Sequence, residues 1–132
     1  MNYSYRRIKS GNSRDKVALL ISISGSINSN DIPQKIQNSH YIYEIVPSNA
    51  KQTPMILKRV EDLSSFKQAY QEFLRHIHSE HPNSKVLKLF PSVPLSIAVC
   101  CGSERLPRVD PSLEVYDYNK NKNVFVKCIN VR

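Results

Sequence analysis

The order of apolar and polar segments along the chain predicts strands that alternate with helices. Residues 17–24, VALLISIS, are a continuous apolar run rich in branched side chains, which is typical of a strand covered on both faces. The segments YIYEIVP at 41–47 and KVLKLF at 85–90 predict two more strands, since β-branched and aromatic residues favour strands. Between these two, apolar residues spaced by three and four predict a helix over 61–78.

Weaker patterns fill the rest of the chain. A short helix is expected near Asp31–Gln37, a short strand at 54–59, and a short helix over 94–103 that ends near Gly102. The segments SLEVYDY (112–118) and NVFVKCINV (123–131) predict the last two strands, and the short polar link between them predicts a hairpin at one edge of the sheet.

These elements predict a single α/β domain whose mainly parallel sheet is flanked by helices and ends in a C-terminal β-hairpin. A length of 132 residues fits one compact domain. We divide the chain into a basic N-terminal segment, 1–16, and the α/β domain, 17–132. Ligands of such sheets usually bind beyond the carboxyl ends of the strands, so we look for a site there.

The net charge of +8 and a sequence pI near 9.5 favour encounters with polyanions, although solvated basic termini explain the same excess. There is no zinc-knuckle spacing, arginine-rich tail or aromatic RNA-binding motif, so sequence-specific nucleic-acid recognition is not expected. The chain has no apolar run of about 20 residues, and its start lacks the apolar core of a signal peptide. We therefore expect a cytoplasmic protein that does not contact a membrane.

A histidine cluster and a cysteine pair suggest a metal site and a catalytic nucleophile, but both have simpler structural explanations. His76, His78 and His81 suggest a metal site, but on a helix only His78 and His81 share a face, so polar decoration of a helix end is the simpler interpretation. Cys100 and Cys101 fall in an apolar helix, where free cysteine packs as a small hydrophobic residue. The three glycines form no phosphate-binding loop. We expect no metal, no cofactor and no catalytic residue.

The segment PSVP, residues 91–94, is a better candidate for a binding site. Its two prolines are expected to stop the preceding strand after Phe90, and Pro94 suits the first turn of a helix. Ser92 and Ser96 then place hydroxyl groups beside the free N–H groups of the helix start, where a phosphate is favoured. The alternative is that Ser92 only caps the helix.

The run LFPSVPLSIAVCCGSERLPRVDPSLEVYDYN resembles the signature of SAVED domains, the cyclic-oligonucleotide sensors of bacterial anti-phage systems. LLISISGSI, YIYEI and EDLSSFKQAYQEFLRHI resemble the same family in the same order, so the resemblance covers residues 17–118, and it is to the second half of a SAVED domain. The matching positions of the signature are Phe90, Pro91, Pro94, Ala98, Val99, Pro107, Arg108, Val115, Tyr116 and Asp117.

The resemblance implies a Rossmann-like fold, related to the CARF sensors of CRISPR systems, that binds a cyclic oligonucleotide in CBASS or CRISPR-linked defence. It also implies action as a homo-oligomer, or with an effector or another SAVED-type subunit. Two alternatives stay open: a ring nuclease that degrades the messenger between two copies, and a structural subunit that binds nothing. The residues expected to contact the ligand are Ser24, Gly25, Ser26, Phe90, Pro91, Ser92, Pro94, Ser96, Arg105 and Arg108.

Overall fold

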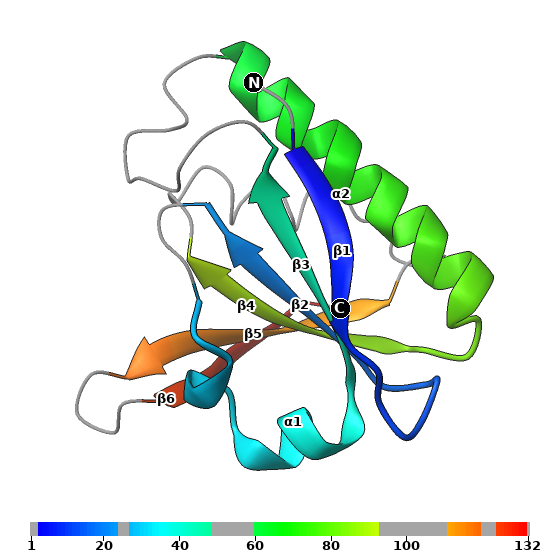
Figure 1. Cartoon of the computed structure of the whole chain (residues 1–132), viewed down its shortest axis with the longest axis vertical. Coiled ribbons are helices and arrows are strands. Elements are labelled where there is room, and N and C mark those ends of the chain that lie inside the picture. Colours follow the sequence, from blue (N-terminus) through cyan, green and yellow to red (C-terminus); the bar gives the residue numbers. More distant parts are fainter. Residues whose placement is uncertain (1–2, 24–26, 49–59, 93–110, 120–123, 132) are drawn as a thin grey trace.

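The computed structural model describes residues 3–23, 27–48, 60–92, 111–119 and 124–131 (Figure 1). The strand predicted at 54–59 and the helix predicted at 94–103 lie outside these residues. The described elements, in chain order, are β1 (Tyr3–Lys9), β2 (Val17–Ser22), the 3-10 helix η1 (Ser29–Asp31), α1 (Gln34–Ser39), β3 (Tyr41–Pro47), α2 (Val60–Glu80), β4 (Val86–Ser92), β5 (Ser112–Asn119) and β6 (Val124–Val131).

The strands form one six-stranded sheet in the order β1-β3-β2-β4-β5-β6. The inner strands β3, β2, β4 and β5 are parallel neighbours, whereas the edge strands β1 and β6 are antiparallel to β3 and β5. The α/β class and the antiparallel C-terminal pair are therefore as predicted. The sheet itself is mixed, because each end of the chain adds an antiparallel edge, so a mainly parallel sheet is not confirmed.

The central strand β2 is buried on both faces, as its continuous apolar run predicts. Val17, Leu19 and Ile21 join the core beneath α2, while Ala18 and Leu20 join a second core with Ile32 and Ile36. Helix α2 thus covers one face of the sheet, and η1 and α1 lie at the other (Figure 1). Successive side chains of a strand point to opposite faces, so a continuous run of apolar residues contributes side chains to both cores.

Helix α2 is held by an apolar face at the predicted helical spacing. Its residues Phe66, Tyr70, Phe73 and Ile77 are almost completely buried. Burying each of these side chains contributes about 1.5–3 kcal/mol, which outweighs the helix's own propensity. No helix within the described residues is long and apolar enough to cross a membrane.

Strand β1 lies in the segment that the sequence analysis treated only as basic. Tyr3 and Tyr5 point toward α2, where their rings pack edge-on against Phe66 and Phe73 at centroid distances of 5.9 and 5.7 Å. The intervening positions are polar, so β1 is an edge strand with one buried face. This alternation of tyrosine with polar residues was the available signal for it.

Strand β4 continues past Phe90, which corrects the expectation that Pro91 stops it. Ile21 and Ser22 of β2 pair with Pro91 and Ser92 of β4 in parallel register. Since the Ser92 carbonyl faces β2, the backbone of Pro91 faces β5, where the register ends at Leu89 opposite Val115. The missing proline N–H therefore breaks no bond of the ladder to β2.

Candidate ligand-binding site

The carboxyl ends of β2 and β4 lie side by side in the sheet. Ser22 and Ser92 are register partners, and the backbone N–H of Ile23 donates to the carbonyl of Ser92 at 3.1 Å. Residues 24–26 follow directly after β2, and residues 93–96 follow directly after β4. The strands that precede the two segments predicted to bind a ligand therefore end side by side, at the same end of the sheet (Figure 1).

Three of the predicted contact residues belong to the described part of the chain. Pro91 and Ser92 are half-buried at the end of β4. Phe90 is fully buried and stacks on Tyr116 at a centroid distance of 4.5 Å. Its side chain is therefore part of the core at this end of the sheet. The remaining predicted contacts lie outside the described residues: Ser24, Gly25, Ser26, Pro94, Ser96, Arg105 and Arg108.

A chain of polar contacts near this edge was missed by the sequence analysis. The Ser22 hydroxyl donates to Oε2 of Glu44 at 2.7 Å, and the Arg6 guanidinium donates to Oε1 of the same carboxylate at 3.0 Å. Glu44 and Ser22 are buried, while the Arg6 side chain is 67% exposed. The carboxylate thus holds a cation at the surface within two residues of the end of β2. The sequence signal for this contact was the glutamate inside the apolar run YIYEIVP, because a charged side chain at a buried position needs a partner.

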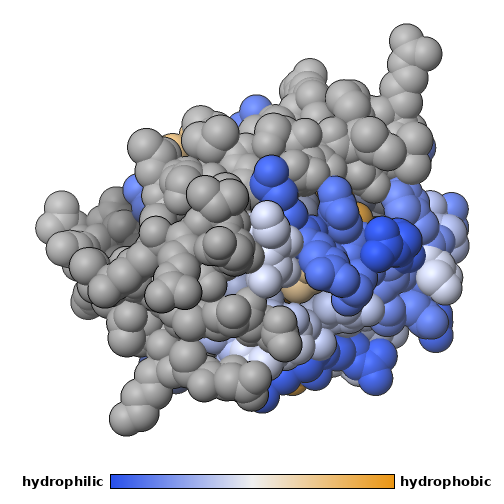
Figure 2. Space-filling model, turned by 90° about the horizontal axis from the view of Figure 1, so that it is seen from above, coloured by the Kyte–Doolittle hydropathy of each residue, from blue (hydrophilic) through white to orange (hydrophobic). Residues whose placement is uncertain are grey.

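Seen from above Figure 1, the described residues present a mainly hydrophilic surface on the right-hand side of the view (Figure 2). Within the described residues, no group of three side chains is arranged to hold a metal ion.

The histidine cluster adopts a different arrangement from the predicted one. His76 and His81 come together, because α2 ends at Glu80 and the chain turns back at His81. Both lie against the Tyr43 hydroxyl, with His81 Nε2 at 2.7 Å and His76 Nε2 at 3.2 Å. The expectation that only His78 and His81 could come together is corrected, because the rings of His76 and His81 lie with their centroids 6.2 Å apart.

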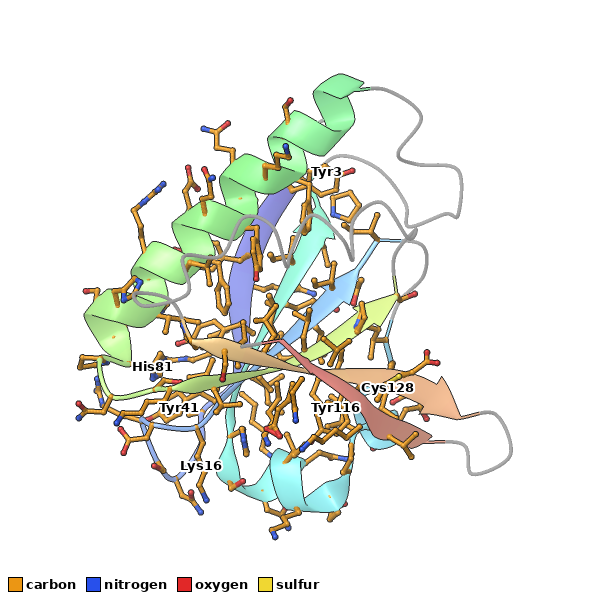
Figure 3. The ribbon with its side chains drawn as sticks, turned by 180° about the vertical axis from the view of Figure 1, so that it is seen from behind. Tyr3, Lys16, Tyr41, His81, Tyr116 and Cys128 are labelled. Carbon is orange, nitrogen blue, oxygen red and sulfur yellow. The ribbon has the colours of Figure 1, made fainter. Side chains whose placement is uncertain are left out.

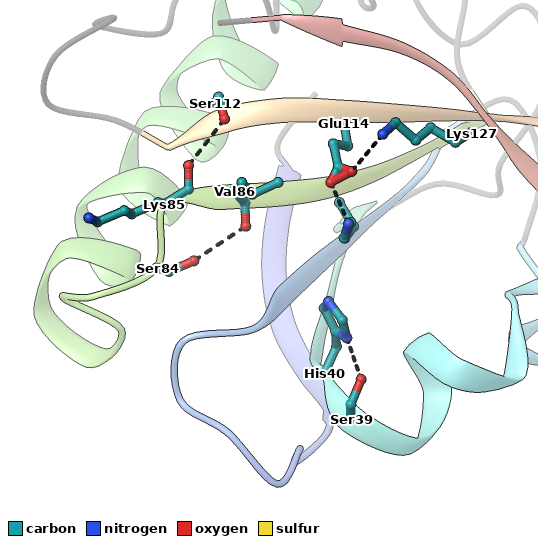
Figure 4. A network of polar contacts seen from close by, with 9 residues as sticks. Ser39, His40, Ser84, Lys85, Val86, Ser112, Glu114 and Lys127 are labelled. Atoms are coloured by element: carbon teal, nitrogen blue, oxygen red, sulfur yellow. Dashed lines mark hydrogen bonds and ion pairs between the residues drawn. The ribbon is translucent and has the colours of Figure 1, made fainter.

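A second polar network lies at the amino ends of the parallel strands (Figure 4). Lys88 and Lys127 both donate to the carboxylate of Glu114, the latter at 3.2 Å. Burial raises the pKa of Glu114, but these hydrogen bonds outweigh it and the net pKa is lowered. Nearby, burial and then the charges of Lys88 and Lys16 lower the pKa of His40 to about 4. His40 is therefore neutral at pH 7.

The chain belongs to the SAVED family. The family model, described as "SMODS-associated and fused to various effectors sensor domain", matches residues 2–131. This confirms the resemblance found in the sequence, and it extends the match to β1. A search of curated proteins gives no match.

Solved structures show the same fold. The Acinetobacter baumannii Cap4 SAVED/CARF-domain containing receptor with the cyclic trinucleotide 2'3'3'-cAAA superimposes with a TM-score of 0.77 at 12% identity, covering 100% of this chain and 28% of the receptor. Its complex with 3'3'3'-cAAA gives the same values. The receptor without a named ligand gives a TM-score of 0.69 at 14% identity, covering 99% of this chain and 26% of the receptor. The chain therefore spans little more than a quarter of the receptor's length.

Proposed function

We propose that this chain binds a cyclic oligonucleotide at the carboxyl ends of β2 and β4 and acts as a sensor in anti-phage defence, of the CBASS or CRISPR-linked kind. The observation that carries the proposal is the pairing of Ser22 with Ser92, which puts the carboxyl ends of β2 and β4 next to each other. These are the two strands that precede residues 24–26 and 93–96 in the sequence. Support comes from the sensor family to which the chain belongs and from one receptor of the same fold, whose structures contain either of two cyclic trinucleotides.

The chemistry of the proposed site suits phosphodiesters. Ser24, Ser26, Ser92 and Ser96 supply hydroxyl groups, and a helix that starts at Pro94 would direct free N–H groups at a phosphate. Arg105 and Arg108 add charge, and Arg6 is a further cation held near the edge by Glu44. Charge-assisted hydrogen bonds from guanidinium to phosphate are about twice as strong as neutral ones, so the arginines are expected to contribute most of the affinity.

We further propose that the chain binds the messenger without degrading it. The described part of the proposed site contains one carboxylate, Glu44, and both of its oxygens already accept hydrogen bonds. A general base has to reach the ribose hydroxyl, and the burial of Glu44 limits that access. Degradation by a ring nuclease between two copies is the outcome that the experiment below would detect.

Action with a second subunit is part of the proposal. The chain matches 28% of the receptor's length, and a cyclic oligonucleotide presents several phosphates around its ring. One such domain can contact only part of the ring, so we expect a second copy, an effector or another SAVED-type subunit to contact the remainder. Light scattering with and without ligand tests this, and a monomer under both conditions would contradict it.

The test of function is calorimetric titration of the chain with a panel of cyclic di-, tri- and tetranucleotides that includes 2'3'3'-cAAA. We expect one ligand to bind, and mass spectrometry to recover it intact. Arg108→Glu should abolish binding, whereas Lys122→Glu, which changes the net charge equally, should weaken it only through screened attraction. Equal losses that both vanish at high salt would indicate a generic polyanion binder. Accumulation of linear products would indicate a ring nuclease.

A further inference from the structure

A pocket of about 450 Å³ lies toward the amino end of β3, and one of its lining residues, Arg6, is also the cation that Glu44 holds near the proposed site. It is bounded by β1, by the first half of β3, by the last turn of α2 and by the loop that contains Arg14. Tyr41 and His81 lie side by side at the lower end of α2 (Figure 3). The size is within the range of about 300–1,000 Å³ that is usual for small-molecule sites.

Hydrogen bonds fix the floor of this pocket in one orientation. His81 Nδ1 lies 2.8 Å from the Arg14 carbonyl, which can only accept, so Nδ1 carries the proton. The neutral ring then accepts from the Tyr43 hydroxyl at Nε2, and Tyr43 oxygen accepts from His76 Nε2. Burial lowers the pKa of His81 and raises that of Tyr43, which favours this neutral arrangement. A floor ordered in this way needs no rearrangement to receive a ligand.

The walls of the pocket combine aromatic rings with positive charge. Tyr5 and Tyr41 are partly exposed, so part of each ring remains open to a ligand. Arg7 and Arg14 carry exposed guanidinium groups, and the one lining carboxylate among the described residues, Glu80, is 3.7 Å from Arg14. An exposed ion pair of this length contributes little, so an anion of better geometry can replace it.

Rings and guanidinium groups around one pocket fit a ligand that is both planar and anionic. Guanidinium binds phosphate through two parallel hydrogen bonds, and tyrosine stacks on a nucleobase. Arg7 lies directly opposite Tyr43 across the β1–β3 pair, which puts charge and rings within the span of one nucleotide. We propose that this pocket binds a nucleoside monophosphate, with its phosphate at Arg7 and Arg14 and its base against Tyr5 and Tyr41.

The experiment is calorimetric titration of the full chain with AMP, with adenosine and with inorganic phosphate. AMP should bind at least about tenfold more tightly than either fragment, because the fragments each keep only one of the two kinds of contact. Arg7→Gln should weaken AMP binding by about tenfold. Lys9→Gln is the matched control, because it removes the same charge from the same strand at an exposed position outside the pocket.

Arg14→Gln gives a second variant with the same expected loss, and a thermal melt checks that each variant is folded. Equal affinity for AMP and inorganic phosphate, or equal losses at Arg7 and Lys9, would overturn the proposal. Failure here is distinguishable from failure of the proposed function, because Arg7→Gln is expected to leave binding of the cyclic oligonucleotide unchanged. Loss of both ligands in a folded Arg7→Gln protein would also overturn a separate pocket.

Discussion

The buried hydroxyl of Ser22 donates a hydrogen bond of 2.7 Å to the carboxylate of Glu44, which lies on the neighbouring strand. Ser22→Ala leaves one oxygen of a buried carboxylate without its donor. We expect the free energy of unfolding to fall by about 1–3 kcal/mol, because an unsatisfied buried charge loses its solvation. Urea unfolding monitored by circular dichroism measures this.

The matched control for Ser22→Ala is Ser112→Ala. The Ser112 hydroxyl donates to the Lys85 carbonyl at the surface, so its removal should cost less than about 0.5 kcal/mol. Equal losses in the two variants would show that the buried contact contributes no more to the free energy of unfolding than a surface hydrogen bond does.

We expect the main effect of a substitution at Phe90 to be on the stability of the fold rather than on ligand binding. Its fully buried ring stacks on Tyr116 and meets Phe125 edge-on at 5.4 Å, so Phe90→Ala opens a cavity beneath the end of β4. We expect a loss of about 3–5 kcal/mol in the free energy of unfolding. Ile8→Ala, at a side chain that is 41% exposed, is the control and should change little. A loss of less than about 0.5 kcal/mol at Phe90, which is the scatter of surface changes, would contradict the packing described above.

Gly11 is expected to tolerate no side chain. A Cβ at this position would lie 2.5 Å from the Ser39 oxygen and 2.5 Å from the His40 carbonyl carbon. Both are backbone atoms that cannot rotate away, so Gly11→Ala should destabilise the protein by about 1–3 kcal/mol. Lys35→Ala, at an exposed position of α1, should be nearly neutral in the same thermal or urea unfolding experiment. An unchanged midpoint for Gly11→Ala would show that the loop can move away.

Stability should fall as the pH is lowered from 7 toward 4. His40 has a folded pKa of about 4 against an ordinary value of 6.5, so the unfolded chain takes up this proton first. Burial lowers the pKa of His81 as well, and its contribution has the same sign. Each histidine adds at most about 1.4 kcal/mol per pH unit. Urea unfolding at pH 7, 6 and 5 should give a shallower slope for His40→Gln than for the wild type, and an identical slope would contradict this account.

The strongest sequence patterns predicted the inner part of the fold. The run at 17–24, YIYEIVP at 41–47 and the apolar face of residues 61–78 each became the expected element, because each buries a continuous apolar surface. Strand β1 was missed because one face of an edge strand carries only Tyr3 and Tyr5 as its signal. The end of β4 was misplaced because the cost of Pro91 depends on which neighbour its backbone faces.

The sequence could predict which segments follow the carboxyl ends of the strands, but not which side chains of different strands meet. The strands that precede residues 24–26 and 93–96 were both recognised in the sequence, and they are parallel neighbours that end side by side. The contact of Ser22 with Glu44, and of Tyr43 with His76 and His81, depends on which strands are neighbours and where a helix ends. No spacing along the chain contains that information.

The most direct test of the central claim places a negative charge at the end of β4. Ser92→Glu and Ser112→Glu make the same chemical change on neighbouring strands, at the carboxyl and the amino end of the parallel sheet. With the cyclic oligonucleotide that the panel identifies, calorimetry should show that Ser92→Glu weakens binding about tenfold or more, since like charges a few Å apart at the surface repel by more than about 1.4 kcal/mol. Ser112→Glu should bind like the wild type. Equal binding by the two folded variants would contradict a ligand site at the carboxyl ends of β2 and β4.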